Sequence, residues 1–321
     1  MTQITIEQIH KDRQNFISTN HPSPAYELGR SIVTTCYNKE FTGGWVLLNE
    51  LFRLNVSIPV EVFYREGELY QNQIDLLKSI SPLIEVKKIQ GVAKNFKDRY
   101  GNTQGWGSKV YALYESKYAE NLWIDCDNYP IRNPEFLFDD PEYIQKGSLF
   151  WRDVFSVDSA DQYSTNSIMW QVFGIQPSDA EPFESGQFLI NKVKCWKQFN
   201  LVKYYADNCE WAYQFGGDKE TWKFAWQLLS NYHSYRNYQA SPSVPFGFMP
   251  FGPFMKGLKN QFGKWGGGTI MVQRDRDGNE LFNHRTMAKF KAFQKNEFNH
   301  DIKNEQFYHD HIKRLEEIDC Q

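Results

Sequence analysis

The sequence contains no long apolar run and no leader of the secretory kind. Its first residues, Met1 to Glu7, have neither a basic stretch nor the apolar stretch that follows one in a signal peptide. No segment reaches the roughly 18 consecutive apolar residues of a membrane-spanning helix. From these absences we expect a chain without signal or anchor that works in the cytoplasm.

Cysteine is scarce, and neither acidic nor basic residues predominate. The 321 residues include five cysteines and no C-x-x-C pair, which argues against a disulfide framework and a zinc site and favours a reducing compartment. The 36 basic and 39 acidic residues are well mixed and leave a net charge of −3. Because nucleic-acid binding needs a basic field, we expect no nucleic-acid partner.

The chain also lacks a glycine-rich phosphate loop. Neither G-x-G-x-x-G nor G-x-x-x-x-G-K-[ST] follows the first predicted strand, residues 32–35. This argues against a dehydrogenase-type dinucleotide fold and a P-loop. Any bound phosphate would have to be held by a metal ion and by cationic side chains.

Aromatic residues are plentiful, at 17% of the chain. Most are expected in the core. A few could line a groove for a sugar, whose C–H faces pack on aromatic rings.

From Ser31 onward, short apolar runs alternate with segments of helical periodicity. Strands are predicted at 32–35, 60–64, 84–86 and 122–124, and helices at 43–54, 72–79 and 108–115. Such alternation predicts an α/β fold with a mostly parallel sheet and helices on both faces.

The later part of the chain is more mixed. A strand is predicted at 168–173, helices at 192–199 and 221–230, a hairpin at 269–284 and a charged helical tail from Met287. A Gly-, Pro- and Phe-rich loop, 240–268, could face a substrate. We divide the chain into an N-terminal leader with a helix (1–28), one catalytic domain (29–292) and a helical tail (293–321).

Two carboxylates follow the strand at 122–124. Asp125 and Asp127 are two residues apart, so on an extended backbone their side chains leave the same side. At the carboxyl end of a buried strand they suggest a divalent cation that carries phosphates. The same D-x-D pattern at Asp275 and Asp277 is predicted to be a hairpin turn closed by Gly278.

Four ordered blocks carry a resemblance to a known family: 125–151 (DCDNYPIRNP, with FD, PEY and GSLFW), 184–187 (ESGQ), 217–221 (GDKET) and 284–286 (HRT). They resemble the signature of the fungal-type α-mannosyltransferases, relatives of the α-1,3- and α-1,2-mannosyltransferases of outer mannan chains. The resemblance spans about residues 30–292. It implies a single GT-A-like domain, a nucleotide-sugar donor and a divalent cation. Fungal members are Golgi-lumenal and carry an N-terminal membrane anchor, which this sequence does not show.

The resemblance implies a metal site at Asp125, Asp127 and His284, holding Mn²⁺ or Mg²⁺. Such an ion offsets the charge of a departing nucleoside diphosphate, and imidazole is acceptable to Mn²⁺. The competing interpretations are a solvated strand end and an ordinary hairpin histidine. His309 and His311, two apart on a predicted helix, are not expected to form a metal pair.

Residues expected to bind the donor are Thr34, Thr35, Tyr37, Lys109, Asp125, Gln187 and Lys289, and Arg285 could join Lys289 on the diphosphate. Lys109 is predicted at a helix start, where its ammonium and the helix N-terminus both attract phosphate. Surface solvation and strand-end hydrogen bonding are the alternatives. Glu184 and Asp218 are the candidates near the reacting carbon. Because the family retains anomeric configuration, a carboxylate there would stabilise an oxocarbenium-like transition state.

The predicted function is a metal-dependent retaining glycosyltransferase that moves mannose from GDP-mannose to a glycan hydroxyl. A hexosyltransferase using UDP-glucose, UDP-galactose or UDP-N-acetylglucosamine is the first alternative. A nucleotidyltransferase and a non-catalytic glycan-binding relative are the others. The expected partners are the donor and a glycan acceptor.

Overall fold

The computed structural model describes residues 4–91, 94–97, 103–152, 166–177, 183–215, 217–229, 254–256, 270–285, 289–296 and 302–319. The predicted loop at 240–268 lies outside these residues, apart from the short strand β10 (Phe254–Lys256).

A six-stranded sheet forms the centre of the molecule, in the order β3-β2-β1-β6-β9-β8. The first four are parallel to one another, whereas β9 is antiparallel to β6 and to β8. The bounds are β1 Glu27–Thr35, β2 Val60–Tyr64, β3 Ile84–Lys88, β6 Tyr118–Ile124, β8 Ser148–Arg152 and β9 Phe183–Asn191. The mostly parallel α/β sheet predicted from the sequence is confirmed.

A second, antiparallel sheet has the order β10-β11-β12-β7. Its strands β11 (Ile270–Arg274) and β12 (Glu280–His284) form the predicted hairpin, and β12 pairs with β7 (Asn128–Pro130). Strands β4 (Phe96–Lys97) and β5 (Thr103–Gln104) form a separate ribbon. Because β7 follows β6 after a three-residue turn, the second sheet meets the first where the parallel strands end.

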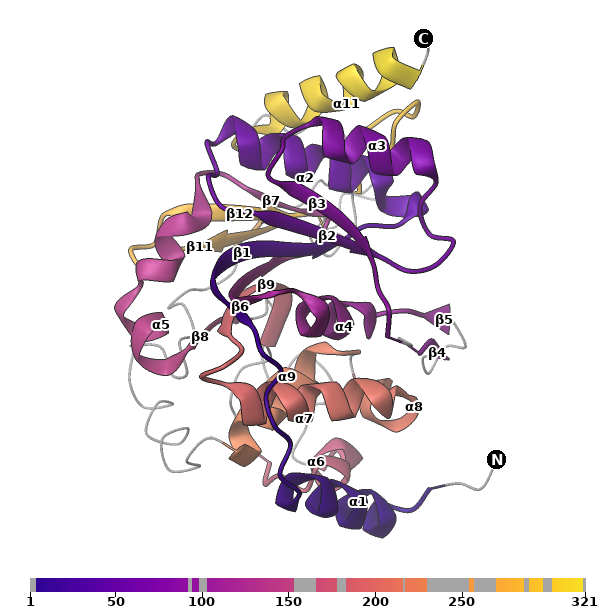
Figure 1. Cartoon of the computed structure of the whole chain (residues 1–321), viewed down its shortest axis with the longest axis vertical. Helices are drawn as coiled ribbons and strands as arrows, with labels where there is room; N and C mark the ends of the chain where they lie inside the picture. The colour runs from indigo at the N-terminus through magenta and orange to yellow at the C-terminus, as the bar shows by residue number, and fades with distance from the viewer. Residues whose placement is uncertain are drawn as a thin grey trace.

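Helices cover both faces of the main sheet (Figure 1). On one side lie α2 (Phe41–Arg53), α3 (Gln71–Ser79) and α11 (Glu305–Asp319). On the other lie α4 (Ser108–Glu115), α7 (Trp196–Asp207), α8 (Cys209–Ala212) and α9 (Lys219–Leu229), with α1 (Ile6–Ser18) and α6 (Ile168–Phe173) beyond them. The short helices are η1 (Asn38–Glu40), η2 (Pro134–Asp139), α5 (Pro141–Lys146) and η5 (Tyr213–Phe215).

Alternating side chains of the central strands supply two cores. Along β6, Leu122 and Ile124 pack on the side of α2 and α11, while Trp123 packs on the side of α4 and α9. On β1, Ile32 and Val33 divide in the same way. A central strand apolar on both faces therefore reads as a continuous apolar run, as the sequence shows.

Three predicted elements differ from the structure. Residues 168–173 form helix α6 and not a strand, because Ser167 caps its N-terminus and Gly174, in the left-handed conformation, ends it. The helix predicted at 192–199 begins only at Trp196, since β9 continues to Asn191. In the tail, the described residues 289–296 are not helical and α11 begins at Glu305.

Candidate functional site

The turn between β6 and β7 carries the two carboxylates of the D-x-D motif. The Asp125 amide donates to the carbonyl of Gly186 (2.8 Å), and the Asn128 amide donates to the carbonyl of Asp125 (2.9 Å). This turn lies at the carboxyl ends of the parallel strands, the edge at which ligands of open α/β sheets bind.

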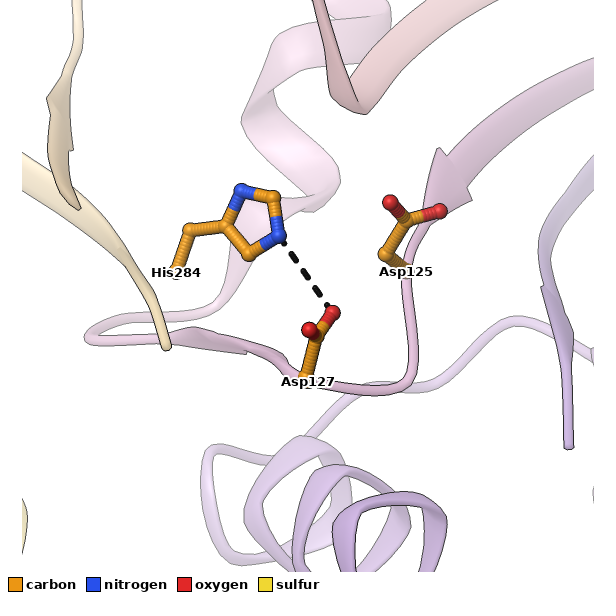
Figure 2. Close-up of side chains that lie close together, drawn as sticks. All are labelled: Asp125, Asp127 and His284. Carbon is orange, nitrogen blue, oxygen red and sulfur yellow. Dashed lines mark ion pairs between the residues drawn. The ribbon is translucent and has the colours of Figure 1, made fainter. Parts of the chain in front are cut away.

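His284 reaches the same place from a distant part of the chain. It is the last residue of β12 and is paired in register with Asn128 at the start of β7. Its Nε2 lies 3.3 Å from Asp127 Oδ1. Figure 2 shows the side chains of Asp125, Asp127 and His284 converging on one space, and one ligand atom from each lies within 4.8 Å of the others.

Glu184 lies on the other side of the imidazole ring. Its Oε1 is 3.2 Å from His284 Nδ1 and accepts a hydrogen bond from the Gly186 amide (2.7 Å). A Cβ on Gly186 would lie 2.5 Å from the His284 ring, so only glycine allows the β9 backbone to approach the imidazole this closely. Glu184 therefore contacts the His284 ring at the nitrogen that does not face Asp127.

Lys109 connects Asp125 with Asp218. Its buried ammonium lies 3.2 Å from Asp125 Oδ1 and 3.3 Å from Asp218 Oδ2, and donates to the carbonyl of Ser185 (2.7 Å). Asp125 Oδ1 also accepts from the indole of Trp123 (2.7 Å). The predicted helix start of Lys109 is confirmed, since α4 begins at Ser108.

A second lysine approaches Asp127. The ammonium of Lys289 lies 3.0 Å from Asp127 Oδ2 and 3.4 Å from Glu40 Oε1. Each of the two motif carboxylates thus has a lysine beside it. A cation bound at the motif would compete with these lysines for the carboxylate oxygens.

Burial and neighbouring charges act on each group differently. Burial raises the pKa of Asp125, and Lys109 offsets only part of that effect. Burial also acts to raise the pKa of Asp127, but His284 and Lys289 outweigh it and hold this pKa well below its usual range.

For the imidazole of His284, burial and neighbouring charges change the pKa in the directions opposite to those for Asp127. Burial acts to lower the pKa of His284, but Asp127 and Glu184 outweigh it and raise this pKa well above the usual range. The imidazole therefore lies between two carboxylates, both of which favour its protonated form. Because a histidine that ligates a metal must be neutral at that nitrogen, binding of a cation would displace a proton.

The cluster opens into a cavity of about 920 Å³. Of the residues predicted to hold the metal ion, to bind the donor or to act on it, those that line the cavity are Thr35, Tyr37, Lys109, Asp125, Asp127, Asp218, His284 and Lys289. Thr34 and Gln187 are fully buried, and Gln187 instead accepts a hydrogen bond from the Asn128 side chain (2.6 Å). Glu184 is not among the lining residues and reaches the site through His284.

Three other sequence expectations concern residues that do not line the cavity. Arg285 does not face the cavity: its guanidinium is buried and bonded to Glu305 of α11 (2.8 Å). Asp275 forms the predicted hairpin turn, in which it accepts from the Asn279 amide (2.7 Å). His309 lies by Glu305 (3.5 Å) and His311 by Glu50 (3.2 Å), so each belongs to a different contact.

Sequence reasoning missed several cavity residues, among them Glu40, Trp106 and Ser185. Trp106 is 40% exposed, unusual for a tryptophan, and its ring packs on Gly217. Its position between two glycines, Gly105 and Gly107, was the available signal. Glu40 follows β1 by five residues, and nothing in its local pattern distinguishes it from a surface glutamate.

The metal-ligating groups of this site fit a hard divalent cation. Two carboxylates and one imidazole are ligands that Mn²⁺ accepts, and carboxylate oxygens are those that Mg²⁺ prefers. Within the described residues, this is the one group of three or more acidic, histidine or cysteine side chains close enough together to hold an ion.

A family model described as "Mannosyltransferase putative" matches residues 29–180. The α-1,2-mannosyltransferase MNN2 of Candida albicans is 26% identical over 121 residues, which is 37% of this chain and 20% of the relative. MNN2 of Saccharomyces cerevisiae is 23% identical over 174 residues, 53% of this chain and 28% of the relative. The chain thus spans less than a third of these relatives, and its resemblance to the fungal-type α-mannosyltransferases is confirmed.

Among solved structures, an active-site mutant of the galactosyltransferase LgtC superposes with a TM-score of 0.52 at 12% identity. The match covers 88% of this chain and 95% of that one. At this identity the likeness concerns the fold, and it confirms the predicted GT-A-like architecture.

The predicted cytoplasmic location is wrong. The relatives that the chain matches are fungal mannosyltransferases of the Golgi lumen. The prediction rested on the absence of a signal or anchor in the sequence. That absence is weaker evidence than the location of the relatives. Among the described residues, no helix is both long and apolar enough to cross a membrane.

Proposed function

We propose that this protein is a metal-dependent, retaining glycosyltransferase that transfers mannose from GDP-mannose to a hydroxyl of a glycan. The observation that supports the proposal best is the convergence of Asp125, Asp127 and His284 in the lining of a cavity of about 920 Å³, which has room for a sugar nucleotide. The similarity to α-1,2-mannosyltransferases favours mannose as the sugar.

Asp125, Asp127 and His284 would hold the ion. When bound, Mn²⁺ or Mg²⁺ neutralises charge on the nucleoside diphosphate as the bond to the sugar breaks. The His284 Nε2 faces Asp127 and is the ring nitrogen available to the ion, whereas Nδ1 faces Glu184. Glu184 thereby fixes the orientation of the ring.

Lys109 and Lys289 would bind phosphate oxygens. Each lies beside a carboxylate of the motif and also lines the cavity, so both place positive charge where the diphosphate of a donor would lie. Preformed positive charge in a buried site lowers the free energy of the departing diphosphate without reorganisation.

Asp218 is the carboxylate we assign to the sugar. It lines the cavity and is linked to Asp125 through the Lys109 ammonium, so it lies beside the metal cluster. A carboxylate there would stabilise positive charge on the anomeric carbon. Because the mechanism retains configuration, the departing phosphate can accept the acceptor proton. Thr35 and Tyr37, at the end of β1, would contact the nucleoside.

A thermal-shift experiment tests the proposal. GDP-mannose, UDP-glucose, UDP-galactose and UDP-N-acetylglucosamine are each added with and without Mn²⁺. GDP-mannose with Mn²⁺ should raise the melting temperature by several degrees, because ligand at a hundred times Kd stabilises by about 2.7 kcal/mol. Asp127→Asn should abolish the shift. Asp277→Asn, at the exposed residue of the hairpin copy of the motif, is the matched control and should retain it.

The outcomes separate the alternatives. A metal-dependent shift with a UDP-sugar alone would mean that the protein transfers another hexose and not mannose. If no sugar nucleotide shifts the melting temperature, or if Asp127→Asn behaves like the control, the proposed site is wrong.

A further inference from the structure

The last residues of β12 point alternately to the candidate metal site and to the C-terminal helix. His284 faces Asp127, as described above. The preceding residue, Asn283, donates from its side chain to the hydroxyl of Tyr308 on α11 (3.1 Å) and to the carbonyl of Lys303 (2.9 Å). Side chains alternate across a strand, so one strand end serves both contacts.

Arg285 continues this alternation and joins the two regions. Its amide donates to the carbonyl of Asp127 (2.9 Å), directly beside the metal candidates. Its guanidinium lies 2.8 and 3.0 Å from the two carboxylate oxygens of Glu305, at the first turn of α11. The ring of Phe290 lies 4.0 Å below it.

This ion pair is almost completely inside the protein. The Arg285 and Glu305 side chains are 1% and 2% exposed. A buried pair of this kind holds its geometry firmly, because removing either partner leaves the other charge buried and uncompensated.

The helix α11 is anchored on its other side to α2. The indole of Trp45 donates to the carbonyl of His311 (2.8 Å), and Asn304, just before α11, donates to Glu50 of α2 (2.8 Å). Helix α2 in turn touches the D-x-D turn, since a Cβ on Gly43 would lie 2.8 Å from the carbonyl oxygen of Cys126. Helices α2 and α11 lie side by side in Figure 1.

We infer that Glu305, acting through Arg285, is a positioning residue that sets His284 at the correct distance from Asp127 for a divalent cation. The inference rests on the proposed metal site. It gives the C-terminal helix a role at the site, although the sequence placed that helix in a tail outside the catalytic domain. Partners beyond the metal ligands commonly change metal affinity by about 10- to 100-fold when mutated.

The test is direct Mn²⁺ binding to the full chain, read by the electron paramagnetic resonance of the free ion, without donor or acceptor. Glu305→Gln should weaken Mn²⁺ binding by about 10- to 100-fold, and Glu305→Asp should restore part of it. Glu317→Gln, on an exposed position of the same helix, is the control and should bind as the natural chain does. Circular dichroism at the same temperature establishes that each variant is folded.

A double variant, R285M/E305M, keeps the test valid if Glu305→Gln does not fold. It removes both members of the ion pair together, a replacement that folded proteins commonly tolerate, and it lacks the directional ion pair. It should fold and bind Mn²⁺ more weakly than the natural chain.

Equal Mn²⁺ affinity of the natural chain and the folded Glu305 variants would overturn the inference and leave the proposed function standing. Absence of Mn²⁺ binding by the natural chain would overturn both. A lower melting temperature with unchanged Mn²⁺ affinity would show that the ion pair supports the fold alone.

Discussion

Two buried lysines show how neighbours decide the state of one residue type. Lys109 is buried, which acts to lower its pKa, but the carboxylates of Asp125 and Asp218 outweigh this and raise it. Lys192 donates to the carbonyls of Leu113 and Ser116 (both 2.7 Å). Burial lowers the pKa of Lys192 to about 6, with only a weak opposing effect from Glu61. Near neutral pH, one lysine is thus a cation and the other a neutral amine.

The neutral amine predicts a pH dependence of stability. An unfolded lysine has a pKa of about 10.4, so between about pH 6 and pH 10 the unfolded chain binds one more proton at Lys192 than the folded chain. The free energy of unfolding then rises with pH, by about 1.4 kcal/mol per unit from this group. Lys192→Met should remove that slope, measured by urea unfolding at pH 6.5, 7.5 and 8.5.

Lys313→Met, an exposed lysine on α11, is the control and should follow the natural chain at each pH. Parallel curves for the natural chain and Lys192→Met would mean that Lys192 is charged in the folded protein.

At the scale of elements, the packing of α2 against the D-x-D turn rests on one glycine. A Cβ on Gly43 would lie 2.8 Å from the backbone oxygen of Cys126, whereas a Cβ on the adjacent Gly44 would lie 2.7 Å from the thiol of Cys36. A backbone atom in a turn cannot move aside cheaply, but a thiol can rotate. The two neighbouring glycines therefore differ in what they tolerate.

Gly43→Ala should destabilise the protein by about 1–3 kcal/mol, the usual effect of overpacking. It should also weaken Mn²⁺ binding, because the turn that carries Asp125 and Asp127 must shift. Gly44→Ala is the matched control and should cost less, because the Cys36 thiol can rotate away from the new methyl group, while the gain of about 1 kcal/mol in helix propensity is common to both variants. Denaturant unfolding and Mn²⁺ titration of both variants measure the difference, and equal effects would contradict this account.

Helices and strands could be predicted from the local sequence pattern where that pattern was long or had clear ends. The βα units from β1 to β6 were predicted because strands buried on both faces read as apolar runs, and the β11–β12 hairpin because Asp277-Gly278 marks a turn. The strand predicted at residues 168–173 was wrong because a run this short, apolar except for Gln171, fits a strand or a helix equally. The capping residues Ser167 and Gly174 would have decided it.

On the scale of the whole molecule, helices near both ends of the chain pack into the cores. Ile9 of α1 belongs to the core on the side of α7 and α9, and Tyr308, Ile312 and Leu315 of α11 to the core on the side of α2. These contacts do not by themselves decide which residues can be removed. The predicted domain boundaries stay a prediction that truncation can test.

A chain that ends at residue 292 should fail to fold cooperatively. It would expose the surface that Tyr308, Ile312 and Leu315 cover, and burying each such side chain stabilises by about 1.5–3 kcal/mol. Their sum is comparable with the whole stability of a domain, about 5–15 kcal/mol. A chain that begins at residue 20 loses Ile9 and Arg13 from the core and should fold with a lower melting temperature.

Thermal unfolding followed by circular dichroism compares the two truncations. A cooperative transition near the natural melting temperature for the chain ending at 292 would show that α11 is a dispensable tail and would favour the predicted boundary.

By itself, the sequence determined the parallel α/β core and the pair Asp125 and Asp127 at a strand end, because these depend on neighbouring residues and on side-chain alternation. Only the tertiary structure decided what surrounds that pair. The sequence analysis had named His284, Lys289, Glu184 and Lys109 as candidate site residues, but their contacts with the pair and with one another come from strand pairing and helix packing, which bring them in from other segments. The local sequence pattern does not show which distant segments pack together. For this reason Arg285 was expected at the diphosphate, whereas its guanidinium pairs with Glu305 on the opposite side of the strand.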